Sequence, residues 1–466
     1  MQNRGLNAVW KPQNRWEWLL GGASLFVVVL LFLSHNYFDI LVTARHGINF
    51  WSILFQGDIL HFYSENTIAS GNIYYNEECA CVYNILIYLI FAVWNIPLAL
   101  LMHFTSIDVM NSIPCLIWIK LLPQIFMVLS TILLKKIMYE LQVDEQVQRL
   151  SLYAYVFSSI SLSCLLTIAQ YDIISVTFQL LGVLAFIRGK KQKFVFWFSI
   201  AFCCKFFAFF LFLPLLLLQE KRIERLLHNA ILFLIPYLVT TLPFSFAERA
   251  NGGINSIVLH LFPRVFWGAE VTANLFYLFY TSLIVYCYLK CPTTHELSRF
   301  AVYASFGAMV LFVGCLGLSV YWIILVAPYF TLFMALCPQN REVNLILETV
   351  GYASLVISKM VSYPAAYWGS TLKPMIWSIL APERVAEHTG RIYTLFYGLS
   401  NMGSNEVFQS MLRTIFLSAM GLIMILAYWN QNGERFGEYN NIYHILSIRF
   451  IVVSVLTLLP VISLFV

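Results

Sequence analysis

Apolar stretches near the length needed to cross a lipid bilayer recur along almost the whole chain. A membrane-spanning helix needs roughly 17 to 25 apolar residues, and stretches of this kind suit helices rather than barrel strands. Of the 466 residues, 60% are hydrophobic and only 11% are charged, whereas about a quarter of the residues in a soluble domain are charged. We therefore predict an all-α, polytopic transmembrane helical bundle with about 11–13 membrane segments. The segments are residues 18–33, 85–102, 116–134, 150–169, 173–187, 194–218, 231–245, 273–289, 300–316, 320–336, 343–361, 414–429 and 450–466.

The longest polar stretches, residues 35–83, 246–271 and 362–410, are too short for independent domains. We expect them to be loops with interfacial helices, and function is best sought there. The net charge of +5 is spread over the loops, so no nucleic-acid partner is expected. Most of the ten cysteines lie in apolar surroundings, and the Cys79-Ala-Cys81 pair lacks partner histidines, so no metal site is expected.

Lysine and arginine mark the cytoplasmic side of membrane proteins. The strongest such signal is Arg188-Gly-Lys190-Lys191-Gln-Lys193, with four positive charges in six residues. Positive charges also precede the first apolar stretch, which ends in Ser-His-Asn rather than in a small-residue cleavage site, so it is predicted to be a retained span and not a signal peptide. The first loop is then outside, and it is net acidic. Its charged residues are Asp39, Asp58, Glu65, Glu77 and Glu78 against Arg45.

Two apolar segments fit this orientation only if neither of them is a single crossing of the membrane. If residues 85–102 are re-entrant or interfacial, Lys135 and Lys136 lie inside and Asp172 lies outside, on the same face as Asp39. Residues 194–218 have basic clusters at both ends and Lys205 in the middle. We predict two short helices that turn near Lys205, because irregular backbone is tolerated where it lines a protein cavity.

An ionisable side chain inside a membrane segment is a functional candidate by default. Lys205 is the clearest case, and it could bind a phosphate or serve as the structural partner of a carboxylate such as Asp172. Asp39 directly follows the first span, where a carboxylate held at a fixed height suits a general base. On position alone, a solvated interfacial acid explains Asp39 equally well.

Two further residues are candidates with alternatives. Asp172 ends the stretch Gln170-Tyr171-Asp172 and could contribute to chemistry or act as the N-cap of the next helix. Arg264 lies among aromatic residues just outside a span, which suits a lipid phosphate or simple interfacial anchoring. The chain has no Walker loop, dinucleotide fingerprint, HExxH, serine nucleophile elbow or DxD. A donor carried by lipid is therefore favoured over a nucleotide-sugar.

Taken in order, these features resemble the GT-C superfamily of membrane glycosyltransferases, and most of all the dolichyl-phosphate-glucose glucosyltransferases of the lipid-linked oligosaccharide pathway. The stretch at residues 170–176 is similar to the family's HFQYNS motif, with Asp172 in place of the asparagine and no preceding histidine. Residues 201–214 resemble the following helices, including the embedded Lys205 before a leucine-proline, and residues 261–274 resemble the LFPF…RG…VANFW segment. The later His-Glu-Lys motif of the family is absent. The resemblance covers residues 30–330.

The resemblance implies a catalytic module in residues 1–340, followed by further membrane segments in residues 341–466. It implies that Asp39 is the catalytic base, that Lys205 and Arg264 bind the donor phosphate, and that Gln170, Tyr171 and Asp172 support the site. The reaction would move one hexose, with inversion, from a polyprenyl-phosphate carrier to a glycan or glycolipid acceptor. It requires no cofactor or divalent metal. The site would face the non-cytoplasmic side of a bacterial or archaeal plasma membrane or of the endoplasmic reticulum.

Two other functions remain open at the level of sequence. A flippase of lipid-linked sugars could use the embedded lysine and the acids as a relay, but it predicts inverted repeats, which the segment pattern lacks. A polymerase or ligase of lipid-diphosphate oligosaccharides would place its catalytic residues in the loop at residues 362–410. Arg384, His388 and Arg391 are its candidates.

Overall fold

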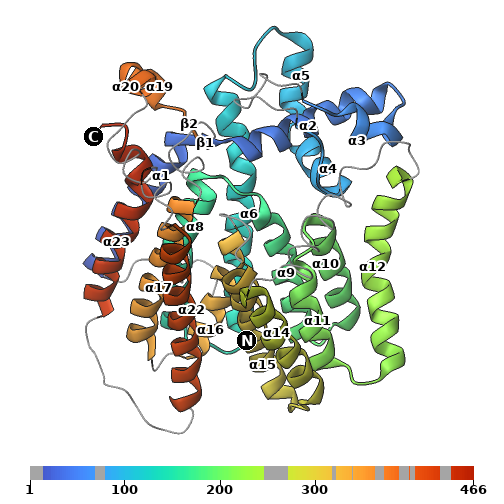
Figure 1. Cartoon of the computed structure of the whole chain (residues 1–466), viewed down its shortest axis with the longest axis vertical. Helices are drawn as coiled ribbons and strands as arrows, with labels where there is room; N and C mark the ends of the chain where they lie inside the picture. Colours follow the sequence, from blue (N-terminus) through green and yellow to red (C-terminus); the bar gives the residue numbers. More distant parts are fainter. Residues whose placement is uncertain are drawn as a thin grey trace. The chain divides into compact units, whose positions relative to one another are not determined.

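The computed structural model describes residues 14–68, 79–245, 271–316, 322–337, 340–362, 372–387, 398, 405–430 and 442–465. Apart from the three-residue strands β1 (His35–Tyr37) and β2 (Leu372–Pro374) and one isolated bridge, the regular elements of these residues are helices (Figure 1). The predicted all-α class is confirmed.

Eight helical stretches in the described residues are long and apolar enough to cross a membrane. They are Arg15–Ser34, Ile113–Glu140, Glu145–Thr167, Ile223–Phe244, Glu296–Cys315, Arg341–Val361, Val407–Ala427 and Ile442–Ile462. A bent helix pair makes a ninth if it is one span. The number reaches the predicted 11–13 only if shorter apolar helices are counted as well, and the described residues have four of these: Asp172–Ile187, Ala208–Gln219, Leu275–Leu289 and Trp322–Leu336. The chain is an integral, multi-pass membrane protein.

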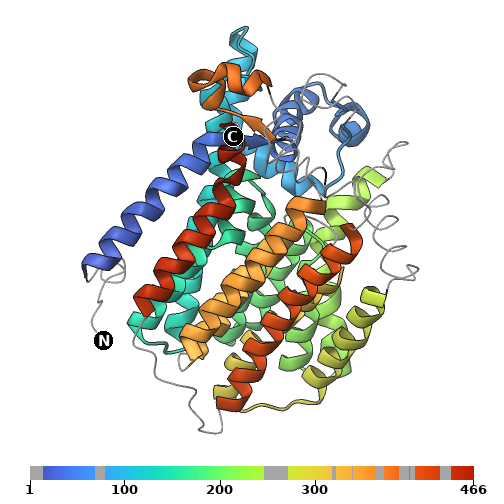
Figure 2. The same ribbon diagram turned by 60° about the vertical axis from the view of Figure 1, so that its left-hand side comes forward.

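The first of two compact units combines Met1–His35, Leu134–Ile168 and Ser319–Val466. Its long helices α17, α22 and α23 pack together, as Figure 2 shows, and α1 packs on α23. A core of aromatic and aliphatic side chains fills the space around Phe157, Leu162 and Val453. The elements of this unit are α1 (Arg15–Ser34), α7 (Glu145–Val156), α8 (Ser159–Ser161), the π-helix η2 (Leu162–Thr167), η5 (Trp322–Leu325), α16 (Ala327–Leu336), α17 (Arg341–Ser362), α19 (Trp377–Leu380), α20 (Pro382–Glu387), α22 (Asn405–Asn430) and α23 (Ile442–Ile462).

The second unit combines Asn36–Leu133 and Ala169–Leu318. In it α9 packs on α10, α10 on α12, and α11 on α14 and α15. The elements of the second unit are α2 (Phe38–Phe55), η1 (Ile59–His61), α3 (Phe62–Glu65), α4 (Ile85–Trp94), α5 (Ile96–Phe104), the larger part of α6 (Ile113–Glu140), α9 (Asp172–Ile187), α10 (Lys191–Cys204), α11 (Ala208–Gln219), α12 (Ile223–Ser245), α14 (Val271–Leu289), α15 (Thr294–Leu311) and η4 (Phe312–Leu316).

The predicted division of the chain into residues 1–340 and 341–466 concerns function, and it stays a prediction.

The apolar segment at residues 85–102, which was predicted to be re-entrant or interfacial, is a pair of helices with a sharp bend between them. Helix α4 starts at the cap residue Asn84, whose side chain accepts a hydrogen bond from Leu86 N at 3.0 Å. It ends at Asn95, and α5 restarts with Pro97 in its first turn. Proline cannot donate to the preceding turn, and the two helices meet at 64°. That this bent pair does not cross the membrane as one span stays a prediction.

The apolar segment at residues 194–218 forms a helical hairpin that turns at Lys205, and this prediction is confirmed. Helix α10 ends in Lys205, whose backbone is extended, and α11 starts at Ala208. The carboxylate of Glu220 pairs with Lys191 Nζ at 3.3 Å and with Arg225 Nη1 at 3.7 Å. The basic clusters before α10 and after α11 therefore lie at one end of the hairpin, and Lys205 lies at the other end.

Helices α2 and α4 approach closely because α2 has glycine at position 47. A Cβ atom there would lie 2.7 Å from Phe91 Cβ and 2.9 Å from the backbone nitrogen of Ala92. We predict that Gly47→Ala lowers the free energy of unfolding by about 1–3 kcal/mol, because the backbone of α4 must shift. Thermal and denaturant unfolding of the purified protein in detergent measures this. Gly22→Ala is the control, since nothing lies within 4 Å there; equal behaviour of the two variants would contradict the close approach.

Candidate functional site

Five buried or partly buried side chains of the second unit meet in what we call the acid–lysine cluster. It consists of Asp39, Tyr83, Tyr171, Asp172 and Lys205. The chain brings them from four places: the start of α2, the residue before Asn84, the start of α9, and the turn between α10 and α11. All of these places are helix ends, where polar backbone and side chains can gather without interrupting a helix.

Asp39 is the second residue of α2 and one of its carboxylate oxygens is held in place. The Tyr171 hydroxyl donates to Asp39 Oδ1 at 3.2 Å, and Thr43 Oγ1 lies 3.1 Å from the same hydroxyl. Some of the residue's surface is exposed, but the Oδ2 atom is enclosed and has no hydrogen-bond partner among the described residues. This geometry contradicts a freely solvated acid and leaves one oxygen available to a bound molecule.

The electrostatic surroundings make Asp39 a stronger base than a free aspartate. The pKa of its carboxyl is raised from 3.8 to about 6: burial raises it most and the neighbouring Asp172 adds to the rise, whereas Lys205 and the hydrogen bond from Tyr171 lower it. A carboxyl with such a pKa is ionised at neutral pH and still accepts a proton readily, as a general base must.

Lys205 forms an ion pair with Asp172. Its Nζ lies 2.8 Å from Asp172 Oδ1, and the two side chains are 6% and 0% exposed. The ammonium also lies 3.9 Å from the centroid of the Tyr83 ring and 4.9 Å from that of Tyr171, distances at which an aromatic face attracts a cation. The predicted structural partnership of Lys205 and Asp172 is confirmed, and phosphate binding by Lys205 stays a prediction.

The alternative that Asp172 caps a helix is wrong. The N-cap of α9 is Tyr171, which makes no side-chain cap hydrogen bond, and Asp172 is the first residue inside the helix. Its Oδ1 faces Lys205 instead, because a buried lysine and a buried carboxylate are each too costly to leave unpaired.

Unpartnered amide side chains flank the cluster in sequence. Gln170 and Asn36 are both fully buried, and neither the oxygen nor the nitrogen of either amide has a hydrogen-bond partner in the described part of the chain. Ala169, just before Gln170, has a φ of +55°, a left-handed conformation that costs a non-glycine residue energy. Buried polar groups without partners in a strained segment are typical of sites completed by water or a ligand.

Of the other predicted site residues, Arg264, His388 and Arg391 fall outside the described residues, and Arg384 lies on α20 in the first unit. Tyr83 was missed by the sequence reasoning, although its position directly before the segment predicted to be re-entrant or interfacial was an available signal. The described residues contain no group of three or more metal-ligating side chains.

No protein-family model, curated protein or solved structure matches this chain. The resemblance to GT-C glycosyltransferases therefore stays a prediction from sequence.

The ion pair predicts a specific pattern of stability in mutants. Lys205→Met leaves the Asp172 carboxylate buried without a partner and should cost about 3–5 kcal/mol of unfolding free energy, whereas the double variant Lys205→Met/Asp172→Leu should regain most of that loss. Lys191→Met is the control, because Lys191 is half exposed beside Glu220 and should cost about 1 kcal/mol or less. Additive losses in the double variant would show that the two residues do not interact.

The raised pKa of Asp39 predicts how stability depends on pH. The folded protein takes up a proton at Asp39 at about pH 6, whereas the unfolded chain does so at about 3.8. The stability that this group contributes is fully present below pH 3.8 and is lost as pH rises through 6, a change of up to about 3 kcal/mol. Asp39→Asn should therefore be more stable than wild type at pH 7, and the difference should shrink toward pH 4. Unfolding measured at both pH values tests this, and lower stability of Asp39→Asn at pH 7 would contradict it.

Proposed function

We propose that the protein is a membrane glycosyltransferase. It transfers a single hexose from a polyprenyl-phosphate carrier to a glycan or glycolipid acceptor on the non-cytoplasmic face, with inversion at the anomeric carbon. The observation that carries the proposal is the enclosed Oδ2 of Asp39, which has no hydrogen-bond partner in the described part of the chain, while Oδ1 of the same carboxylate is held by the Tyr171 hydroxyl.

Asp39 acts as the general base. Its Oδ2 accepts the proton of the acceptor hydroxyl while the hydroxyl oxygen attacks C1 of the donor sugar and the bond from C1 to the phosphate oxygen breaks. One displacement inverts the anomeric centre, and the carrier leaves as a polyprenyl phosphate. A positioned general base contributes roughly 10²–10⁴-fold to the rate of such a step.

Cations stabilise the phosphate that leaves. Lys205 is held near Asp39 by its ion pair and by the tyrosine rings, and Arg264 is the second cation that we assign to this task. Fixed positive charge in a site of low dielectric can lower the barrier by several kcal/mol. The amides of Asn36 and Gln170 are suited to hydrogen-bond sugar hydroxyls, since both a donor and an acceptor of each are free within the described residues.

The hairpin geometry supports the proposed side of the membrane. Lys191 and Arg225 lie at the end of the α10–α11 hairpin opposite Lys205. Basic ends are cytoplasmic by the positive-inside rule, so the turn at Lys205 and the cluster around it belong on the non-cytoplasmic side. A carrier whose sugar is displayed on that side reaches Asp39 without entering the cytoplasm.

The test is an assay with purified protein in lipid nanodiscs and radiolabelled polyprenyl-phosphate hexoses. Asp39→Asn keeps the oxygen that accepts from Tyr171 and loses the base, so turnover should fall by about 10²-fold or more. For wild type, kcat/KM should fall tenfold per pH unit below about pH 6, the pKa of Asp39. Asp58→Asn, in the same loop but more than half exposed, is the matched control and should retain full turnover. Equal turnover of Asp39→Asn and wild type would remove Asp39 from the mechanism.

A further inference from the structure

The span at Glu145–Thr167 in the first unit is interrupted in its middle. Helix α7 ends at Val156, and the short α8 starts again at Ser159 with Ser158 as its N-cap. The amide of Ser161, which a continuous helix would direct to Phe157 O, donates to Ser158 Oγ at 2.9 Å instead. The break therefore leaves main-chain carbonyl groups of this span without their helical donors, a cost of several kcal/mol each in a lipid environment.

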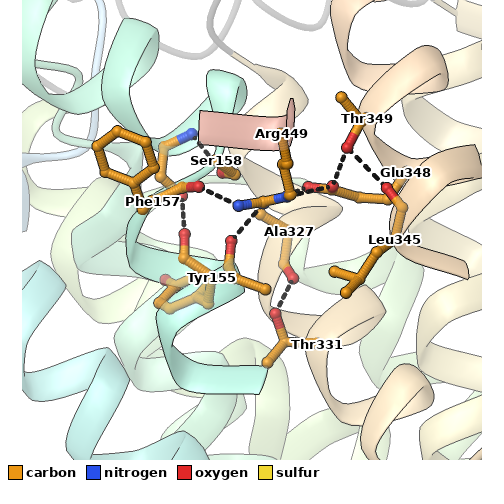
Figure 3. Close-up of polar contacts among 11 residues, drawn as sticks. Tyr155, Phe157, Ser158, Ala327, Thr331, Leu345, Glu348, Thr349 and Arg449 are labelled. Atoms are coloured by element: carbon orange, nitrogen blue, oxygen red, sulfur yellow. Dashed lines mark hydrogen bonds and ion pairs between the residues drawn. The ribbon is translucent and has the colours of Figure 1, made fainter. Parts of the chain in front are cut away.

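Side chains replace the missing donors. Ser161 Oγ donates to Tyr155 O at 2.7 Å. Arg449, on α23, donates from Nη2 to Ala154 O at 2.7 Å and from Nη1 to Phe157 O (Figure 3). Three carbonyls around the break are thus satisfied by two side chains, and two of the three depend on one arginine.

The arginine is also neutralised by a carboxylate. Arg449 Nε and Nη2 donate to the two oxygens of Glu348 on α17, each at 2.8 Å, and both side chains are almost completely buried. Thr349 Oγ1 lies 3.3 Å from the same carboxylate. Every nitrogen of the guanidinium has a partner, so the group has no free face for a ligand, in contrast to the acid–lysine cluster.

We propose that Arg449 is a helix cap supplied by a distant helix, and that Glu348 is present to make its charge tolerable. The pair is a conformational device that keeps the span at 145–167 broken at Phe157. An ordinary buried ion pair contributes through its two charges, and apolar residues can often replace both partners with little loss. A cap contributes through its donors to the backbone, so replacing both partners leaves the carbonyls of Ala154 and Phe157 unsatisfied.

A double-mutant cycle on the full-length protein in nanodiscs separates these roles. Arg449→Met should lower the folding equilibrium constant by about 100-fold or more. The double variant Arg449→Met/Glu348→Leu should stay about as unstable as the single arginine variant. Amide hydrogen exchange of residues 158–162 should become at least tenfold faster in both variants. The matched control is the pair of Arg149 and Glu17, joined at 3.0 Å in the same unit, where Arg149→Met/Glu17→Leu should stay close to wild type.

Milder variants keep the test decisive if Arg449→Met does not fold. Glu348→Gln retains the cap and should be more stable than Arg449→Lys, which keeps the charge but loses the fork of donors that reaches two carbonyls. Recovery of wild-type stability and wild-type exchange in Arg449→Met/Glu348→Leu would overturn the capping role. So would Glu348→Gln being the less stable of the two milder variants.

Discussion

The ion pair between Lys205 and Asp172 governs the arrangement of the second unit. An ammonium and a carboxylate within apolar helices are each expensive to bury, and together they are tolerated only in direct contact. Their contact at 2.8 Å requires the start of α9 and the turn after α10 to lie at the same end of the unit. Tyr171 follows directly, because it precedes Asp172, and through its hydroxyl it fixes Asp39. The candidate site is thus a consequence of one electrostatic requirement.

The Arg449–Glu348 pair and the acid–lysine cluster both bury charged groups among apolar helices, but they differ in whether the surrounding polar atoms have partners. Around Arg449 each donor nitrogen and both oxygens of Glu348 have partners, so the centre is closed and contributes to structure. Around Lys205, the Oδ2 of Asp39 and the amides of Gln170 and Asn36 lack partners within the described residues. Unsatisfied buried groups lower stability, and in a membrane protein such a cost is characteristic of a site that gains its partners from a substrate. This contrast favours chemistry at the second centre and not at the first.

Much of the second unit could be predicted from the sequence because charges in apolar segments are conspicuous. Lys205 between two basic clusters predicted a hairpin, and treating residues 85–102 as re-entrant or interfacial predicted that Asp172 and Asp39 share a face. Contacts between distant residues were beyond this reasoning. Glu348 and Arg449 are 101 residues apart, and nothing in the apolar segments that contain or adjoin them indicates that they pair. Tyr83 and Ala169 were missed for a related reason, since a contact between a cation and an aromatic ring and a positive φ both depend on packing that sequence periodicity does not show.

The cap on the broken span has a consequence for the order in which the protein is made. Phe157 and Arg449 are separated by 292 residues, and a ribosome adding about 5–20 residues per second needs roughly 15 to 60 s to synthesise that length. During this interval the earlier span lacks the donors that Arg449 supplies. Its two carbonyls must then bind water, or the span must form a continuous helix that breaks when α23 is added. The broken form of this span is therefore completed only late in biogenesis.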